Sequence, residues 1–222
     1  MQKTRIEGVL WDMDGVLIDS ERLVQSVFVE VMDQGGPVPD PEKRYLETIG
    51  LNRTGLINWF LQFVPDEQTA EIWIDKTRDG FNQRSRTELQ LKPGVKESLD
   101  HLTQLGIQQM VVTSTRTAMA EDKLERMGLL EYFDSILGGD QVENGKPHPE
   151  PYQRGCQKLG IDAPSALAIE DSPNGVLSAL SAGCAVIHIP DLIETDPVWE
   201  QRLTARLNSL AEFPAWMSRH CQ

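Results

Sequence analysis

Short apolar runs alternate with helical stretches in the second half of this chain, and that alternation constrains the fold more than any other feature. The strand-length runs are Ile107–Thr113, Phe133–Leu137, Ala166–Ile169 and Ala185–Ile189. The helical stretches around them end at Gly106, Gly128, Gly160 and Gly183. Glycine commonly ends a helix, and strands that alternate with helices form βαβ units. The sequence therefore predicts an α/β fold with a parallel sheet.

A fifth apolar run, Ile6–Trp11, opens the chain and is separated from the others by a long region of helical pattern. The expected core of this helical region consists of Trp59, Phe60, Phe63, Ile72, Trp73 and Phe81. We therefore expect one α/β domain, residues 1–18 and 91–222, interrupted by an inserted helical domain, residues 19–90. After the last strand, Asp196–Phe213 is expected to form a final helix and tail.

The chain is acidic, with 34 Asp and Glu against 21 Lys and Arg among its 222 residues, and a net charge of −13. A nucleic-acid-binding protein needs a concentrated basic surface, so we expect no nucleic-acid partner. The same charge repels small anions. A phosphate ester can serve as substrate only if a metal ion and a few cations reverse the charge locally.

Cysteine use and the N-terminal sequence predict a cytoplasmic protein. Cys156, Cys184 and Cys221 are widely spaced and odd in number, so they form no metal motif and no plausible disulfide framework, which suits a reducing compartment. The first residues reach Asp12 and Asp14 before an apolar stretch of signal-peptide length can form. No apolar run reaches the roughly 18 residues of a membrane span, so no membrane association is expected. The oligomeric state stays open between a monomer and a weak homo-oligomer.

Polar residues that suit phosphate chemistry follow the predicted strands. They are Asp12 and Asp14, Thr113 and Ser114, Lys146 in a loop, and Glu170 and Asp171. In an open parallel sheet, ligands bind beyond the carboxyl ends of the strands. We therefore expect these side chains to converge at that edge.

Asp12 and Asp14 are two positions apart, which places their side chains on the same side of an extended segment. Carboxylates held together repel, and they favour a shared proton or a bound cation. With Asp171 they offer the hard oxygen ligands that Mg²⁺ takes alongside a substrate phosphate. One aspartate can attack phosphorus and the other can transfer the proton, while a lysine and a hydroxyl hold the phosphoryl oxygens.

Four segments that carry these residues resemble, in the same order, the four motifs of the haloacid dehalogenase superfamily. They are DMDGVLIDSE at Asp12–Glu21, VVTST at Val111–Thr115, GKPHPEPY at Gly145–Tyr152 and AIEDSPNG at Ala168–Gly175. The chain is similar above all to the branch of small phosphatases and β-phosphoglucomutase-like proteins. That branch implies a Rossmann-like parallel-sheet core with an inserted helical cap that governs substrate specificity, and the cap matches residues 19–90.

The resemblance implies a role for each residue of the first three motifs. Asp12 matches the nucleophile, which also binds Mg²⁺. Asp14 matches the general acid and base, with its backbone carbonyl on the metal. Thr113 matches the hydroxyl that bonds the phosphoryl group, and Ser114 adds a backbone N–H. Lys146 matches the cation that steadies the nucleophile and the phosphoryl charge.

The fourth motif implies the remaining metal ligands. Asp171 matches a direct ligand of Mg²⁺. Glu170 either reaches the metal, directly or through water, or accepts a structural hydrogen bond.

The resemblance extends to the cap. The segment Ile49–Gly55 resembles the cap loop that faces the active site in this branch. Arg53 in this loop suits a bidentate contact with an anionic group of the substrate, and Asn52 suits a substrate hydroxyl. Arg116, just after the second motif, is another candidate substrate contact. Both arginines fit plain surface charge equally well.

Two comparisons within the family narrow the reaction. The pattern of dehalogenating members lacks the second aspartate of the first motif. The presence of Asp14 therefore favours phosphoryl transfer over cleavage of a carbon–halogen bond. β-Phosphoglucomutase-like proteins carry a histidine shortly after the first motif, whereas no histidine precedes His101 here. We therefore expect a Mg²⁺-dependent phosphomonoesterase that hydrolyses a small metabolite phosphate, such as a sugar phosphate, through an aspartyl phosphate on Asp12. A phosphosugar mutase and a non-catalytic regulatory protein that binds a phosphate ligand remain as alternatives.

Overall fold

A computed structural model of the chain describes residues 5–193 and 197–220. The chain divides into two compact units: Met1–Ile18 together with Leu91–Gln222, and Asp19–Gln90. The first is termed the core unit and the second the cap unit. Among the described residues, no helix is both long and apolar enough to cross a membrane.

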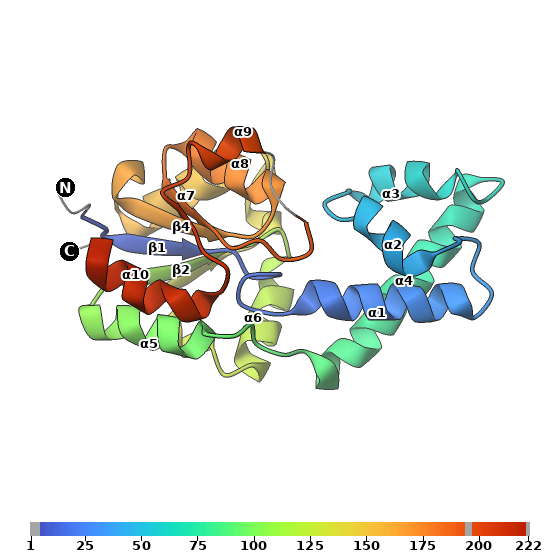
Figure 1. The fold of residues 1–222 in the computed structure, drawn as a ribbon, viewed down its shortest axis with the longest axis horizontal. Helices are drawn as coiled ribbons and strands as arrows, with labels where there is room; N and C mark the ends of the chain where they lie inside the picture. Colours follow the sequence, from blue (N-terminus) through green and yellow to red (C-terminus); the bar gives the residue numbers. More distant parts are fainter. Residues whose placement is uncertain (1–4, 194–196, 221–222) are drawn as a thin grey trace. The chain divides into compact units, whose positions relative to one another are not determined.

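A six-stranded sheet, in which every pair of neighbouring strands is parallel, forms the centre of the core unit (Figure 1). The strands are β1 (Gly8–Trp11), β2 (Gln108–Val112), β3 (Ser135–Leu137), β4 (Ala166–Glu170), β5 (Ala185–His188) and β6 (Ala205–Arg206). Their order is β3-β2-β1-β4-β5-β6, so β1 lies between β2 and β4. β1 and β4 are buried at every residue, and strands buried on both faces have nearly continuous apolar sequences. The predicted α/β fold with a parallel sheet is confirmed.

Helices cover both faces of this sheet. They are α5 (Val95–Leu105), α6 (Thr117–Arg126), α7 (Glu150–Leu159), α8 (Pro173–Ala182) and α10 (Phe213–His220). α7 and α8 pack on the face that carries Leu10, Met110 and Ala168. On the opposite face Phe213 of α10 meets Trp11 nearly edge-on, with ring centroids 5.4 Å apart. Figure 1 shows α7 and α8 on one side of the sheet and α5 and α10 on the other.

The end of the core unit differs from the final helix and tail expected over Asp196–Phe213. Asp196 lies outside the described residues, as does Cys221. The rest of the stretch forms α9 (Pro197–Glu200), β6, the 3-10 turn η5 (Leu210–Glu212) and the start of α10. β6 pairs with only Ile187 and His188 of β5. A two-residue strand has no periodicity of its own, so the helical prediction there was wrong.

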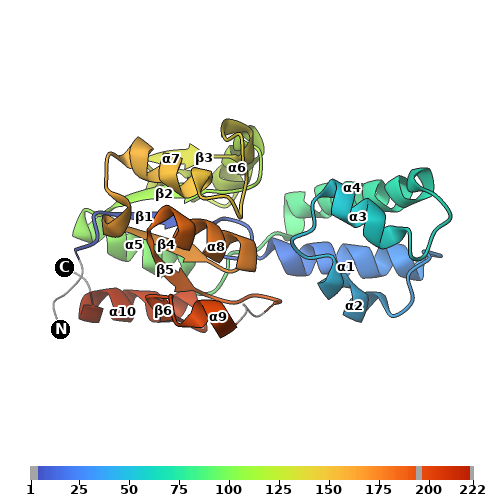
Figure 2. The ribbon, with the colours of Figure 1, turned by 90° about the horizontal axis from the view of Figure 1, so that it is seen from above.

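Helices make up the cap unit, and Figure 2 shows α3 beside α4. They are α1 (Ser20–Asp33), α2 (Pro41–Arg44), the 3-10 turn η1 (Tyr45–Glu47), α3 (Arg53–Phe60) and α4 (Glu67–Glu88). The ring of Phe28 on α1 lies 5.6 Å from that of Tyr45, 6.2 Å from that of Trp59 and 6.3 Å from that of Phe60. This aromatic cluster joins α1, η1 and α3.

The predicted core of the helical region was correct for Trp59 and Phe60, which are buried, and wrong for Ile72, which is 48% exposed. Ala70 is fully buried, and Ile74 lines a pocket of the cap unit. Ile72 lies two positions from each, which turns its side chain to the opposite side of α4.

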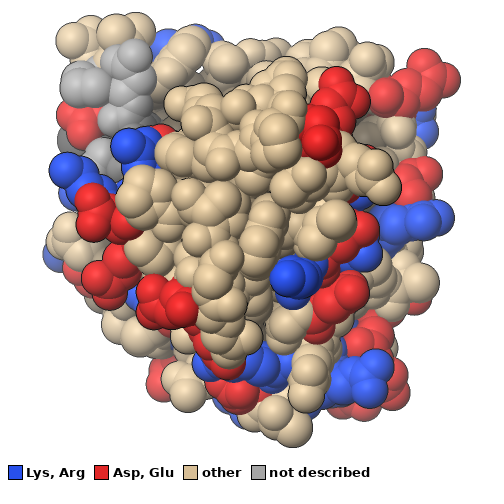
Figure 3. Space-filling view, turned by 90° about the vertical axis from the view of Figure 1, so that its right-hand side faces the viewer, with Lys and Arg blue, Asp and Glu red and all other residues tan. Residues whose placement is uncertain are grey.

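Charges of both signs mix on the face of the molecule shown in Figure 3. Basic side chains there lie among acidic ones, around a broad uncharged area. This pattern differs from the concentrated basic surface that a nucleic-acid backbone requires.

Candidate active site

The middle of the sheet brings predicted site residues to one edge. β1 lies between β2 and β4, with Trp11 beside both Val111 and Ile169. Asp12 follows β1, Thr113 follows β2, and Glu170 ends β4. Because the carboxyl ends of parallel strands meet at one edge, these three side chains emerge there together.

Three buried carboxylates gather at this edge. Asp12, Glu170 and Asp171 each offer one oxygen, and these oxygens lie within 4.8 Å of one another. The loop after β1 approaches them closely at Gly15, where the φ angle is +90° and a Cβ would lie 2.0 Å from Oδ2 of Asp171. A side chain at Gly15 would therefore displace a carboxylate of this cluster.

Lys146 connects two of the three carboxylates. Its Nζ donates to Oδ1 of Asp12 at 2.6 Å, to Oε1 of Glu170 at 2.6 Å and to the carbonyl of Val112 at 2.9 Å. Burial alone lowers the pKa of this ammonium, but Asp12 and Glu170 outweigh it, so the pKa of Lys146 is raised. Lys146 is therefore a permanently charged partner of the carboxylates at neutral pH.

Burial and the neighbouring acidic groups raise the pKa of the Asp12 carboxyl. Burial raises the pKa of its carboxyl to about 7, and Glu170 and Asp14 act in the same direction while Lys146 opposes them. The three clustered carboxylates outnumber the charge that Lys146 brings. A divalent cation relieves such an excess, and hard oxygen donors are the ligands that Mg²⁺ and Ca²⁺ prefer. Asp12, Glu170 and Asp171 therefore fit a metal ion.

The carboxylate of Asp14 has other partners than this cluster. Lys123 on α6 donates to its Oδ1 at 2.9 Å, and the hydroxyl of Thr115 donates to its Oδ2 at 2.7 Å. The metal role that the sequence implies for Asp14 concerns its backbone carbonyl. Its side chain is thus available for a different function from that of Asp12.

The turn after β2 holds the other predicted residues of the second motif. Thr113 is buried, and its Oγ1 accepts a hydrogen bond from the backbone N–H of Thr115 at 3.1 Å. Ser114 is exposed. Arg116 is also exposed and forms the N-cap of α6, without a side-chain capping bond. Thr113 thus lies at the sheet edge, whereas Arg116 lies at the start of a helix.

Several residues that contact the site, such as Tyr152, His188 and Lys123, could not be assigned a role from the sequence. The hydroxyl of Tyr152 donates to Oε1 of Glu170 at 2.5 Å, Nε2 of His188 lies 3.1 Å from the carbonyl oxygen of Asp171, and Lys123 contacts Asp14. Tyr152 closes the segment GKPHPEPY, so its place in the third motif was a usable signal. Lys123 and His188 stand in no motif that would single them out.

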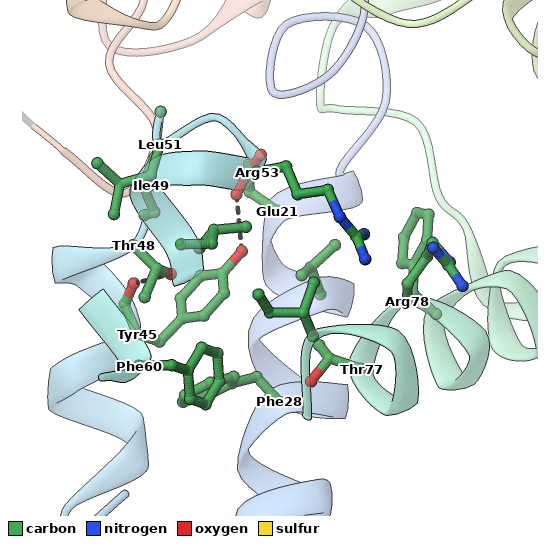
Figure 4. A pocket seen from close by; sticks show the side chains of 15 residues that line it. Glu21, Phe28, Tyr45, Thr48, Ile49, Leu51, Arg53, Phe60, Thr77 and Arg78 are labelled. Carbon is green, nitrogen blue, oxygen red and sulfur yellow. Dashed lines mark hydrogen bonds between the residues drawn. The ribbon is translucent and has the colours of Figure 1, made fainter. Parts of the chain in front are cut away.

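The cap unit contains a cavity of about 400 Å³, shown in Figure 4. Its apolar lining consists of Val24, Phe28, Ile49, Leu51, Leu56, Phe60, Ile74 and Phe81. In its wall the hydroxyl of Tyr45 donates to Oε2 of Glu21 at 2.8 Å. The cavity therefore combines an apolar lining with a few polar groups, as small-molecule sites do.

The two cap residues predicted to contact substrate differ in their surroundings. Arg53 lines this cavity, and its guanidinium pairs with Glu71 at 3.2 Å and with Asp75 at 3.3 Å. Hydrogen bonds to these carboxylates raise the pKa of Arg53. Oδ1 of Asn52 accepts from the backbone N–H of Gly55 at 2.9 Å and caps α3. The structure thus gives Asn52 a capping role that the sequence analysis did not predict.

Known proteins are similar to this chain in sequence and in fold. Residues 9–189 match the family described as haloacid dehalogenase-like hydrolase. A phosphorylated carbohydrates phosphatase from Thermotoga maritima is 31% identical over 183 residues, which cover 82% of this chain and 84% of that protein. A phosphoglycolate phosphatase from Neisseria gonorrhoeae is 30% identical over 189 residues, which cover 83% of this chain and 80% of that protein.

A solved structure shows the same architecture. The crystal structure of a haloacid dehalogenase family hydrolase from Deinococcus radiodurans, with bound phosphate and sodium, superposes with a TM-score of 0.83. The two chains are 26% identical, and the superposition covers 98% of this chain and 97% of the other. Sequence and fold agree, and the chain belongs to the haloacid dehalogenase-like hydrolase family.

Proposed function

We propose that the protein is a Mg²⁺-dependent phosphomonoesterase that acts through an aspartyl phosphate on Asp12. The observation that carries the proposal is the joint contact of Lys146 with Asp12 and Glu170, beside Asp171. In this arrangement a buried cation and three buried carboxylates that fit a metal ion lie together at one edge of the sheet, which supports Asp12 as the nucleophile and the three carboxylates as metal ligands. Family membership and the phosphatase relatives support the same reaction.

In the first step an oxygen of Asp12 attacks phosphorus and the bond to the leaving oxygen breaks. Lys146 holds the Asp12 carboxylate in place and offsets charge on the phosphoryl oxygens. Thr113 and the backbone at Ser114 hold the phosphoryl group. Mg²⁺, when bound by Asp12, Glu170 and Asp171, supplies positive charge that offsets the negative charge of the substrate.

In the second step water replaces Asp12 on phosphorus. Asp14 protonates the leaving oxygen in the first step, and it accepts a proton from the attacking water in the second. Inorganic phosphate leaves, and Asp12 and Asp14 return to their initial states. The hydrogen bonds from Lys123 and Thr115 that anchor the Asp14 carboxylate support this division of labour.

The proposed substrate is a small phosphorylated metabolite such as a sugar phosphate. The relatives named above carry substrate names of this class, a phosphorylated carbohydrate and phosphoglycolate. We propose that the cap unit selects among such substrates and that Arg53, which lines the cap cavity, contributes to the selection. Arg116 is proposed as a second substrate contact.

A purified-protein assay tests the reaction. We expect the enzyme to release inorganic phosphate from 4-nitrophenyl phosphate in the presence of Mg²⁺ and to lose this activity in excess chelator. Asp12→Asn should fold normally and release no phosphate. Undiminished turnover in excess chelator would contradict the requirement for a metal ion. Full activity of Asp12→Asn would contradict the role of Asp12 as the nucleophile. Isomerisation of a sugar phosphate without release of phosphate would indicate a mutase instead.

A further inference from the structure

We propose that Lys123 is a positioning residue for the reaction, which fixes the carboxylate of Asp14 for proton transfer. The inference rests on the proposed function, in which Asp14 is the general acid and base. Lys123 lies outside the four motif segments, which assign it no role.

The contact geometry fixes both oxygens of Asp14. Nζ of Lys123 lies 2.9 Å from Oδ1, and the hydroxyl oxygen of Thr115 lies 2.7 Å from Oδ2. One hydrogen bond to each oxygen defines the plane of a carboxylate, which a single bond does not. Each oxygen keeps a second lone pair, so these bonds do not prevent Asp14 from exchanging a proton with substrate or water.

The burial of Lys123 shows that this contact is built into the fold. Its side chain is only 9% exposed, and Lys123 lies on the side of α6 that carries the fully buried Ala120 and Leu124. An ammonium placed on such a face costs free energy unless a carboxylate pairs with it. Asp14, 109 positions away in the sequence, is the carboxylate that does so.

The reaction gives this contact a specific consequence. A general acid contributes about 10²- to 10⁴-fold to a rate when it is aligned with its proton acceptor. A misplacement of about 1 Å can cost on the order of 10²-fold. An alkoxide leaves poorly and needs this proton, whereas 4-nitrophenolate leaves well without it. Loss of Lys123 should therefore affect alkyl phosphates more than aryl phosphates.

The experiment compares kcat/KM for 4-nitrophenyl phosphate and for an alkyl phosphate such as glycerol phosphate, because kcat/KM covers the steps up to departure of the leaving group. Lys123→Met keeps the length of the side chain and removes its charge. We expect its loss on the alkyl phosphate to exceed its loss on the aryl phosphate by about 10-fold or more. Lys123→Arg should recover part of the difference, and Asp14→Asn should show a larger difference in the same direction.

Thr115→Val removes the other bond and tests the proposal if Lys123→Met folds poorly. It should show the same preference for the aryl substrate. Lys158→Met, at an exposed lysine of α7, is the matched control and should lose neither activity. Equal losses on both substrates in Lys123→Met and Thr115→Val, with a large difference in Asp14→Asn, would overturn the role of Lys123. A wild-type enzyme that hydrolyses neither ester would instead overturn the proposed function itself.

Discussion

Nζ of Lys146 lies 2.6 Å from Oδ1 of Asp12, although 134 positions separate the two residues in the sequence. The same Nζ lies 2.6 Å from Glu170, so Lys146 keeps two buried carboxylates from facing each other without a cation. Lys146→Met should destabilise the protein by about 3–5 kcal/mol, because it leaves buried charge uncompensated. It should also lower kcat by roughly 10²- to 10³-fold, since a cation that offsets phosphoryl charge is lost.

Chemical denaturation and phosphate-release assays measure both effects. Lys96→Met, at an exposed lysine of α5, is the control and should match the wild type. A Lys146→Met enzyme with normal kcat would mean that Lys146 only stabilises the fold.

Gly15→Ala should weaken metal binding. A Cβ at position 15 would lie 2.0 Å from Oδ2 of Asp171, so this carboxylate must move. We expect the Mg²⁺ concentration for half-maximal activity to rise by about 10-fold, as losses in the support of metal ligands typically cost about 10- to 100-fold in affinity.

The control for Gly15→Ala separates this contact from backbone strain. Gly128 also has a positive φ angle, +67°, but a Cβ there would meet nothing within 4 Å. Gly128→Ala should therefore lose stability, by about 1–2 kcal/mol, and keep the wild-type Mg²⁺ dependence. The same Mg²⁺ dependence in both variants would show that Gly15 does not support the metal site.

Arg53→Ala should change substrate selection more than stability. The Arg53 side chain is 48% exposed, and exposed ion pairs such as those with Glu71 and Asp75 contribute little to folding. We expect kcat/KM to fall on a sugar phosphate and to change much less on 4-nitrophenyl phosphate, with nearly unchanged Tm. Arg86→Ala, at another exposed position of the cap unit, is the matched control. Equal losses of kcat/KM on both substrates would show that Arg53 does not contribute to substrate specificity.

The charge of Glu150 should stabilise the loop that contains Glu143 and Asn144, and acid should remove this stabilisation. Its carboxylate accepts hydrogen bonds from the backbone N–H groups of Glu143 and Asn144, both at 2.9 Å. The bond from Glu143 is the main cause that lowers the pKa of Glu150 from 4.5 to about 2. A lowered pKa means that the stabilisation is complete above pH 4.5 and is lost as the pH falls toward 2.

Glu150→Gln should therefore be less stable than the wild type at pH 7, and the difference should shrink as the pH falls through this window. Urea unfolding of both proteins across the pH range measures it. Glu131→Gln, at an exposed glutamate, is the control. A difference that stays constant down to pH 2 would contradict the role of the Glu150 charge.

The sequence by itself determined the sheet and the residues at its edge. Apolar runs and the helices between them are local patterns, and the carboxyl ends of parallel strands meet at one edge of the sheet. Asp12 and Glu170 could be placed at one edge because each stands at the end of such a run. The resemblance of the motifs to the haloacid dehalogenase superfamily then identified the family.

Only the tertiary structure decided which side chains meet. Lys123 donates a hydrogen bond to Asp14, which lies 109 positions earlier in the sequence. Tyr152 of α7 donates a hydrogen bond to Glu170 of β4. Helical periodicity predicts that α4 and α6 each have a buried side. Which side is buried depends on the element that packs against the helix. For that reason Ile72 is exposed although it is apolar, and Lys123 is buried although it is charged. Hydrophobic patterns are local, whereas the pairing of a buried charge depends on contacts between distant segments.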